Sequence, residues 1–155
     1  MTTSHTCPHC GGIFEDAKAH KRSTPQHRRF MAICRAAYFS WPDTHEFRPI
    51  SEQHLRYYLE MRAGNFSITK QARIESTDPH KLYALMSAFM RHSEDHTLFV
   101  ELDGNLLIQK KVGSVSYEAM GPTEFGRLKD AVCEIIEAEI GIAAEKLLSE
   151  TERAA

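Results

Sequence analysis

The sequence has no long hydrophobic run, no internal repeat and no low-complexity tract. A membrane-spanning helix needs about 20 mostly apolar residues, and no stretch approaches that length. The first residues lack the charged and then apolar layout of a signal peptide, so we expect a cytoplasmic protein without a membrane partner. The sequence also contains no P-loop, dinucleotide-binding glycine pattern, His-Glu-x-x-His motif or recognisable Ser/His/Asp arrangement. We therefore expect a protein that is not an enzyme.

Length and composition are those of an ordinary globular domain. The chain has 155 residues, of which 42% are apolar and 26% charged. That is enough to bury a hydrophobic core without disulfides or other cross-links. We expect a zinc-knuckle-like N-terminal segment over residues 1–22, followed by a single α+β domain over residues 23–150.

Charge is spread unevenly along the chain, although the net charge is only −2. Residues 1–35 carry six basic and two acidic side chains, whereas residues 114–155 carry four basic and nine acidic ones. This asymmetry predicts a basic face for a polyanion and an acidic helix that points elsewhere. Two solvated helix faces would give the same pattern, so charge alone does not decide the function.

Cysteine is scarce, with four residues in the chain, but two of them are spaced as metal ligands. Cys7 and Cys10 flank Pro8-His9 and precede Gly11-Gly12, a turn that lets both thiolates face one tetrahedral Zn²⁺ ion. In a reducing compartment such a pair is better explained by metal binding than by a disulfide. The expected zinc ligands are Cys7, Cys10, His20 and His27.

The histidine spacing departs from that of the usual zinc finger, so His5 stays open as a substitute ligand. Two free thiols in a flexible tail are the alternative to a metal site. Cys34 and Cys133 each lie among apolar residues at helical spacing, and we expect both in the core.

A basic run follows the cysteines and leads into a helix. Ser23-Thr24-Pro25 is a helix-start signal, with a hydroxyl N-cap and a proline near the first helical position. Backbone donors and basic side chains at a helix start suit a phosphate. A solubilising helix start is the alternative. The expected nucleic-acid-binding residues are Lys21, Arg22, Gln26, Arg28, Arg29 and Arg35.

The periodicity of apolar residues predicts several helices and a small sheet. The expected helices cover about 25–39, Glu52–Arg62, a segment opened by Asp78-Pro79, and about 123–148. The expected strands are Phe66–Ile74, Thr97–Leu102 and Leu106–Val112, the last two joined by Asp103-Gly104-Asn105 as a hairpin. We expect an α+β fold with a small antiparallel sheet packed against three to four helices and an N-terminal zinc knuckle.

Two further expectations concern the apolar side chains of the third helix and the remaining histidines. The third helix carries an apolar set that comprises Leu82, Leu85, Met86, Phe89 and Met90. The histidines outside the N-terminal region share no common spacing, and we expect them at the surface: His45, His54, His80, His92 and His96.

Three segments resemble phage proteins. Arg22-Ser23-Thr24-Pro25-Gln26-His27-Arg28-Arg29 resembles the Arg-Ser-x-x-Gln-Asn-Arg-Lys segment of the NinB (Orf-type) recombination mediators. With Phe30-Met31-Ala32 it is similar to a helix of an uncharacterised phage family. Ala63-Gly64-Asn65-Phe66 and Ser114-Val115-Ser116-Tyr117-Glu118-Ala119-Met120, followed by Glu124-Phe125, look like later segments of that family. Those families have a strand hairpin where this chain has the cysteine turn.

The resemblance implies an α+β protein that binds single-stranded DNA, forms a homodimer and cooperates with single-strand binding protein. Its matching positions are Arg22, Ser23, Gln26, Arg28 and Arg29. We expect a non-enzymatic, zinc-containing, nucleic-acid-binding accessory protein of phage or prophage DNA recombination or replication. The alternative is a phage module that inhibits or adapts a host protein, with a purely structural zinc site and the acidic last helix as contact. A zinc-dependent nuclease is a third hypothesis.

Overall fold

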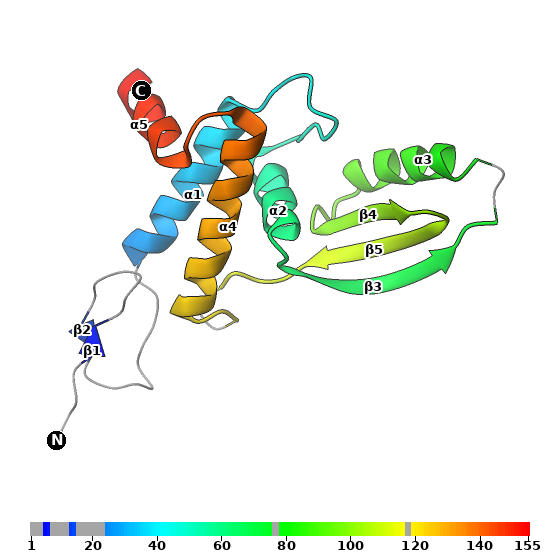
Figure 1. Cartoon of the computed structure of the whole chain (residues 1–155), viewed down its shortest axis with the longest axis horizontal. Helices are drawn as coiled ribbons and strands as arrows, with labels where there is room; N and C mark the ends of the chain where they lie inside the picture. Colours follow the sequence, from blue (N-terminus) through cyan, green and yellow to red (C-terminus); the bar gives the residue numbers. More distant parts are fainter. Residues whose placement is uncertain (1–4, 7–12, 15–23, 76–77, 117–118) are drawn as a thin grey trace. The chain divides into compact units, whose positions relative to one another are not determined.

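The computed structural model describes residues 5–6, 13–14, 24–75, 78–116 and 119–155 (Figure 1). The chain divides into two compact units. The helical unit contains Met1–Asp43 and Ser114–Ala155, and the sheet unit contains Thr44–Gly113. The expected boundary of one domain over residues 23–150 stays a prediction.

Three helices build the core of the helical unit. α1 spans Thr24–Phe39, α4 spans Pro122–Ile140 and α5 spans Ala144–Ala154, and α1 packs against both others. Phe30 on α1 meets Phe125 on α4 edge to face, with ring centroids 5.3 Å apart, a favoured geometry for an aromatic pair. The other fully or almost fully buried residues of this unit include Ile33, Cys34, Ala37, Val132, Ile136 and Leu147.

The final helical stretch is broken at Gly141. This residue adopts the left-handed conformation, with φ of +80°, and its N–H bonds to the carbonyl of Glu137 at 2.8 Å. Glycine ends helices in this way because it has no Cβ to oppose a positive φ. The single helix expected over 123–148 is therefore wrong. Two helices, α4 and α5, occupy this stretch. The described chain therefore has five helices, whereas three to four were expected.

The sheet unit contains a three-stranded antiparallel sheet. Its strands are β3 (Phe66–Arg73), β4 (Leu98–Asp103) and β5 (Leu106–Val112). β5 lies in the centre, with β3 and β4 at the two edges. The hairpin between β4 and β5 turns at Gly104, which has a φ of +60°. The expected hairpin is confirmed, and so is the α+β class.

Two helices pack against this sheet. α2 (Glu52–Arg62) is capped by the hydroxyl of Ser51, which accepts the N–H of His54 at 3.1 Å, and it contacts β5. α3 (Pro79–Arg91) lies along β4, as Figure 1 shows. The buried centre of the unit comprises Met61, Phe99 and Val112, with Phe47, Tyr57, Tyr58 and Phe66 packed around it.

The N-terminal region contributes one further strand pair. β1 (His5–Thr6) pairs in antiparallel fashion with β2 (Ile13–Phe14). The segment between them contains Cys7 and Cys10, which lie outside the described residues, as does His20. The expected zinc knuckle therefore stays a prediction. No helix of the described chain combines the length and the apolar character needed to cross a membrane.

Candidate nucleic-acid interface

The structure describes four of the six residues expected to bind nucleic acid. Lys21 and Arg22 lie outside the described residues. Gln26 is buried in the helical unit, and so are both polar atoms of its side-chain amide. In this position the amide cannot contact a nucleic acid on the surface. Helix α1 thus places neighbouring residues of the basic run in different environments.

His27 faces the interior as well. Its ring lies against that of Phe125, with centroids 5.8 Å apart and planes inclined by 31°, and its Nδ1 is buried. A histidine held in this way is better suited to fixing a metal site against the helical unit than to touching a phosphate.

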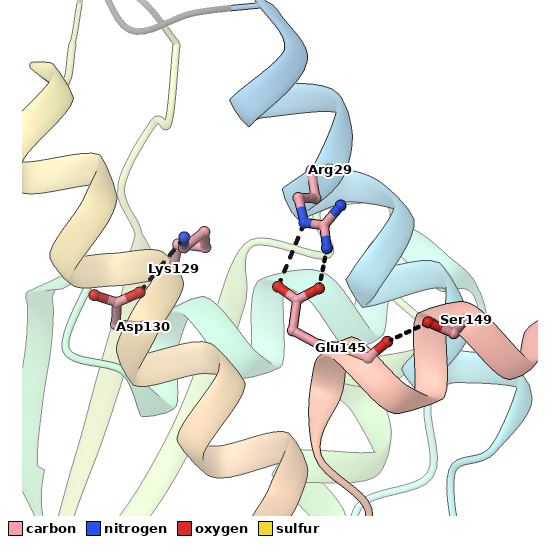
Figure 2. Close-up of polar contacts among 5 residues, drawn as sticks. All are labelled: Arg29, Lys129, Asp130, Glu145 and Ser149. Carbon is pink, nitrogen blue, oxygen red and sulfur yellow. Dashed lines mark hydrogen bonds and ion pairs between the residues drawn. The ribbon is translucent and has the colours of Figure 1, made fainter. Parts of the chain in front are cut away.

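Arg29 is exposed but engaged. Its Nε donates to Oε1 of Glu145 on α5 at 3.4 Å, and its Nη2 pairs with Oε2 of the same carboxylate (Figure 2). This bond and the charge of Glu145 raise the pKa of Arg29 above its ordinary value. The Oγ of Ser149 in turn donates to the carbonyl oxygen of Glu145 at 3.0 Å. Arg29 is therefore paired with a carboxylate of the same unit, although both side chains stay exposed to solvent.

Arg28 and Arg35 form a row on the exposed side of α1. They are seven residues apart, which is two helical turns or roughly 10 Å along the axis. Phe39 continues the row one turn further on, with 61% of its surface exposed. The guanidinium carbon of Arg35 lies 5.7 Å from the centre of the Phe39 ring. We call Arg28, Arg35 and Phe39 the α1 row.

A shallow depression opens beside the aromatic end of this row. Its volume is about 440 Å³, and it is lined by the end of α1 and by α5, including Phe39, Leu147, Glu150 and Thr151. The lining is apolar apart from one carboxylate and two hydroxyls. A flat apolar group stacked on Phe39 would find room here.

A second basic surface lies on the sheet unit. β3 carries Lys70 and Arg73 and no acidic residue, while β5 carries Lys110 and Lys111. Lys110 is engaged, because its Nζ pairs with Glu101 and lies 4.3 Å from the centre of the Phe66 ring.

The ladder places two of these basic residues on one face of the sheet. Lys70 lies opposite Gln109, and Lys111 lies opposite Ser67. Directly opposed residues share a face, so Lys70 and Lys111 are diagonal neighbours across β3 and β5. The acidic residues of the sheet, Glu101 and Asp103, lie on β4 at the other edge. The same face carries Leu98, Val100 and Leu102 on β4 and Leu107 on β5. The two lysines therefore border an apolar area and do not form a continuous basic surface.

His54 differs from the expectation that it lies at the surface. It is 3% exposed, lies between the rings of Phe47 and Phe99, and accepts the N–H of Ile50 through Nδ1 at 3.3 Å. Burial, together with the nearby His96 and Arg91, lowers its pKa to about 4. The expectation was wrong because it considered only histidine spacing. The helical neighbours Leu55 and Tyr58 were the signal that this face of α2 is covered.

Two cysteines expected in the core lie within the helical unit. Cys34 is buried, and Cys133 is half-buried. Burial raises the pKa of the Cys133 thiol, which disfavours the reactive thiolate form. Within residues 24–75, 78–116 and 119–155, no three His, Cys, Asp or Glu side chains gather as a metal site would require.

Comparisons of the chain with protein-family models, with curated proteins and with solved structures find no match. The resemblance to phage recombination mediators thus stays an expectation from the three segments that carry it.

Proposed function

We propose that the protein binds single-stranded nucleic acid through the α1 row, without enzymatic activity, as an accessory protein of phage or prophage DNA recombination or replication. The observation that carries the proposal is the alignment of two exposed arginines and one exposed aromatic ring on one face of a helix. Arginine guanidiniums supply charge to phosphates, and an exposed ring supplies a surface on which a base stacks.

The exposed ring favours single strands over duplexes. In a duplex each base is already stacked on its neighbours, so Phe39 gains a partner only where a base is unpaired. Backbone contacts and stacking carry little sequence information, so we propose binding with weak sequence preference.

Zinc has a supporting part in this proposal. Cys7, Cys10, His20 and His27 would hold one Zn²⁺ ion and fix the segment that carries Lys21 and Arg22 in front of α1. The spacing of the two cysteines supports this role. So does the pairing of β1 with β2, which brings together the two ends of the segment that contains both cysteines. The zinc ion is structural in this account and does not touch the nucleic acid.

The alternative function, docking on a host protein through the acidic final helix, has less support. The acidic helix expected over about 123–148 corresponds to α4 and the first part of α5. Both helices bury their apolar residues within the helical unit: Phe125, Leu128, Val132, Ile136, Ala144, Leu147 and Leu148. The residues they leave exposed are mostly polar and charged, and protein interfaces are depleted of charged residues at their centres.

The proposal is tested by zinc analysis together with a fluorescence anisotropy titration of labelled 20-nucleotide DNA, single-stranded and duplex, at two salt concentrations. We expect one zinc per chain, none in Cys7→Ser/Cys10→Ser, tighter binding of the single strand, and weaker binding at the higher salt. Equal affinity for both DNA forms, or affinity independent of salt, would contradict the nucleic-acid part. One zinc retained by the double serine variant would contradict the metal part.

A further inference from the structure

The depression beside Phe39 has a chemical character that its apolar lining does not reveal. Helix α1 ends at Phe39, so the negative end of its dipole lies at the depression. The volume of about 440 Å³ is within the range of sites that hold small organic groups. A flat ring that stacks on Phe39 and enters the depression therefore meets the polar groups of its walls.

The polar side chains on the α5 wall of the depression are hydrogen-bond acceptors. Glu150 is exposed there, and a carboxylate accepts hydrogen bonds without donating any. Thr151 donates its hydroxyl proton to the carbonyl oxygen of Leu147 at 2.9 Å, so its Oγ1 has only lone pairs left to offer. Among the lining side chains, the Ser40 hydroxyl on the α1 wall is the one that can still donate.

The charges around the depression favour a base over a phosphate at this place. Lys146 and Arg153 lie about one helical turn from Glu150 on α5, but neither lines the depression. The Glu150 carboxylate and the negative end of the α1 dipole repel a phosphate, whereas the arginines of the α1 row attract one. A strand bound to the α1 row therefore keeps its phosphates on the arginines and turns a base toward the depression.

The bases differ in what their edges offer to a wall of acceptors. Cytosine presents an amino group at the position where thymine and uracil present a carbonyl oxygen. An amino group can donate to a carboxylate, and pairing of Glu or Asp with the amino group of cytosine is one of the side-chain contacts that read base edges. A carbonyl oxygen that faces Glu150 would instead bring two acceptors together and leave both without a donor.

We propose that Glu150 makes the depression a subsite that prefers a base with an exocyclic amino group over thymine or uracil. Thr151 supplies a second acceptor on the same wall. The inference rests on the proposed function, because it concerns the base that stacks on Phe39. One base of the bound strand is read in this way, so the preference is modest and the rest of the strand is bound with little regard to sequence.

Fluorescence anisotropy with labelled 20-nucleotide oligodeoxycytidine and oligodeoxyuridine, at neutral pH and one salt concentration, tests the proposal. The two strands have the same backbone, and the amino group of one base is replaced by a carbonyl oxygen in the other. We expect the wild type to bind oligodeoxycytidine about three- to tenfold more tightly. Glu150→Gln should bring the ratio of the two affinities close to 1, because an amide both donates and accepts.

Glu152→Gln removes an equal charge from an exposed position of α5 outside the depression and is the matched control. It should tighten binding of both strands and leave the ratio of their affinities as in the wild type. Equal affinity of the wild type for the two strands, or an unchanged ratio in Glu150→Gln, would overturn the inference while the proposed function stands. The same change of ratio in both variants would also overturn it, because charge alone would then set the preference. Absence of binding to either strand would overturn the inference and the proposed function together.

Discussion

Arg29 and Glu145 lie 116 residues apart in the sequence, and their ion pair joins α1 to α5. Both side chains are exposed, so the pair adds little stability, about 0.2–1 kcal/mol by comparison with other exposed pairs. Its larger consequence is electrostatic, because Glu145 pairs with Arg29, the exposed arginine of α1 that does not belong to the α1 row.

Glu145→Gln should therefore tighten binding of single-stranded DNA, by roughly two- to fivefold at low salt, because Arg29 becomes available to a phosphate. Glu134→Gln removes an exposed carboxylate from α4 and is the matched control for net charge. Fluorescence anisotropy at low salt measures both. Equal effects of the two variants would mean that only net charge matters.

His54 should make the stability of the protein dependent on pH. The unfolded histidine takes up a proton near pH 6.5, and the folded one only near pH 4. Between these values the unfolded state binds more protons, so stability present above pH 6.5 is lost as the pH falls toward 4. Between pH 7 and pH 5 the expected loss is about 2 kcal/mol.

Urea unfolding at pH 7 and pH 5 checks this value. His54→Phe keeps an aromatic ring in the cluster and should flatten the dependence, whereas His80→Phe, at an exposed position, should leave it unchanged. Hydrogen bonds from Thr97 also lower the pKa of Asp95. A carboxyl group with a lowered pKa takes up its proton below pH 5, so Asp95 does not contribute to the change between pH 7 and pH 5. A His54→Phe variant as pH-sensitive as the wild type would contradict the assignment.

Gly141 should resist substitution for reasons of backbone conformation alone. A Cβ at this position would meet nothing within 4 Å, but φ is +80°. Gly141→Ala is expected to cost about 1 kcal/mol, seen as a lower thermal midpoint. Gly121→Ser is the control, because φ is −72° there and serine suits the N-cap of α4. An unchanged midpoint for Gly141→Ala would show that the helix break is not fixed by glycine.

Much of the fold was predictable from the sequence because it depends on local signals. Apolar periodicity predicted α1 and α2, and Asp103-Gly104-Asn105 predicted the hairpin. Asp78 was recognisable as the start of α3, and its carboxylate does accept the N–H of Lys81 at 3.1 Å. Gly141 lies within the helical pattern over 123–148, and a glycine inside such a pattern does not reveal its own φ.

The candidate site was less predictable because it depends on which face of each helix is covered. Gln26, Arg28 and Arg29 are neighbours in the sequence, yet α1 buries the first, exposes the second and pairs the third with a residue on α5. Phe39 was missed because the basic run drew attention to charged side chains, although its place four residues after Arg35 puts it on the same face of α1. Leu85 and Phe89 belong to the apolar set of α3 but face outward, which periodicity alone cannot distinguish from burial.

Phe39 should contribute stacking energy and no charge. Phe39→Ala is expected to weaken binding of single-stranded DNA by about 1–3 kcal/mol, which is roughly 5- to 150-fold, without changing the salt dependence. Phe39→Tyr keeps the ring and should bind like the wild type. The same titrations at several salt concentrations separate the two quantities. A loss for Phe39→Tyr as large as for Phe39→Ala would argue against stacking.

The salt dependence of binding by Arg28→Ala/Arg35→Ala tests the account most directly. Each phosphate contact to a single strand contributes about 0.7 to the slope of log affinity against log salt, so removing two should lower the slope by about 1.4. Arg127→Ala/Arg153→Ala removes two exposed arginines of the helical unit outside the α1 row and should leave the slope nearly unchanged. An unchanged slope for Arg28→Ala/Arg35→Ala would contradict nucleic-acid binding through the α1 row. So would an equal decrease of the slope in both double variants.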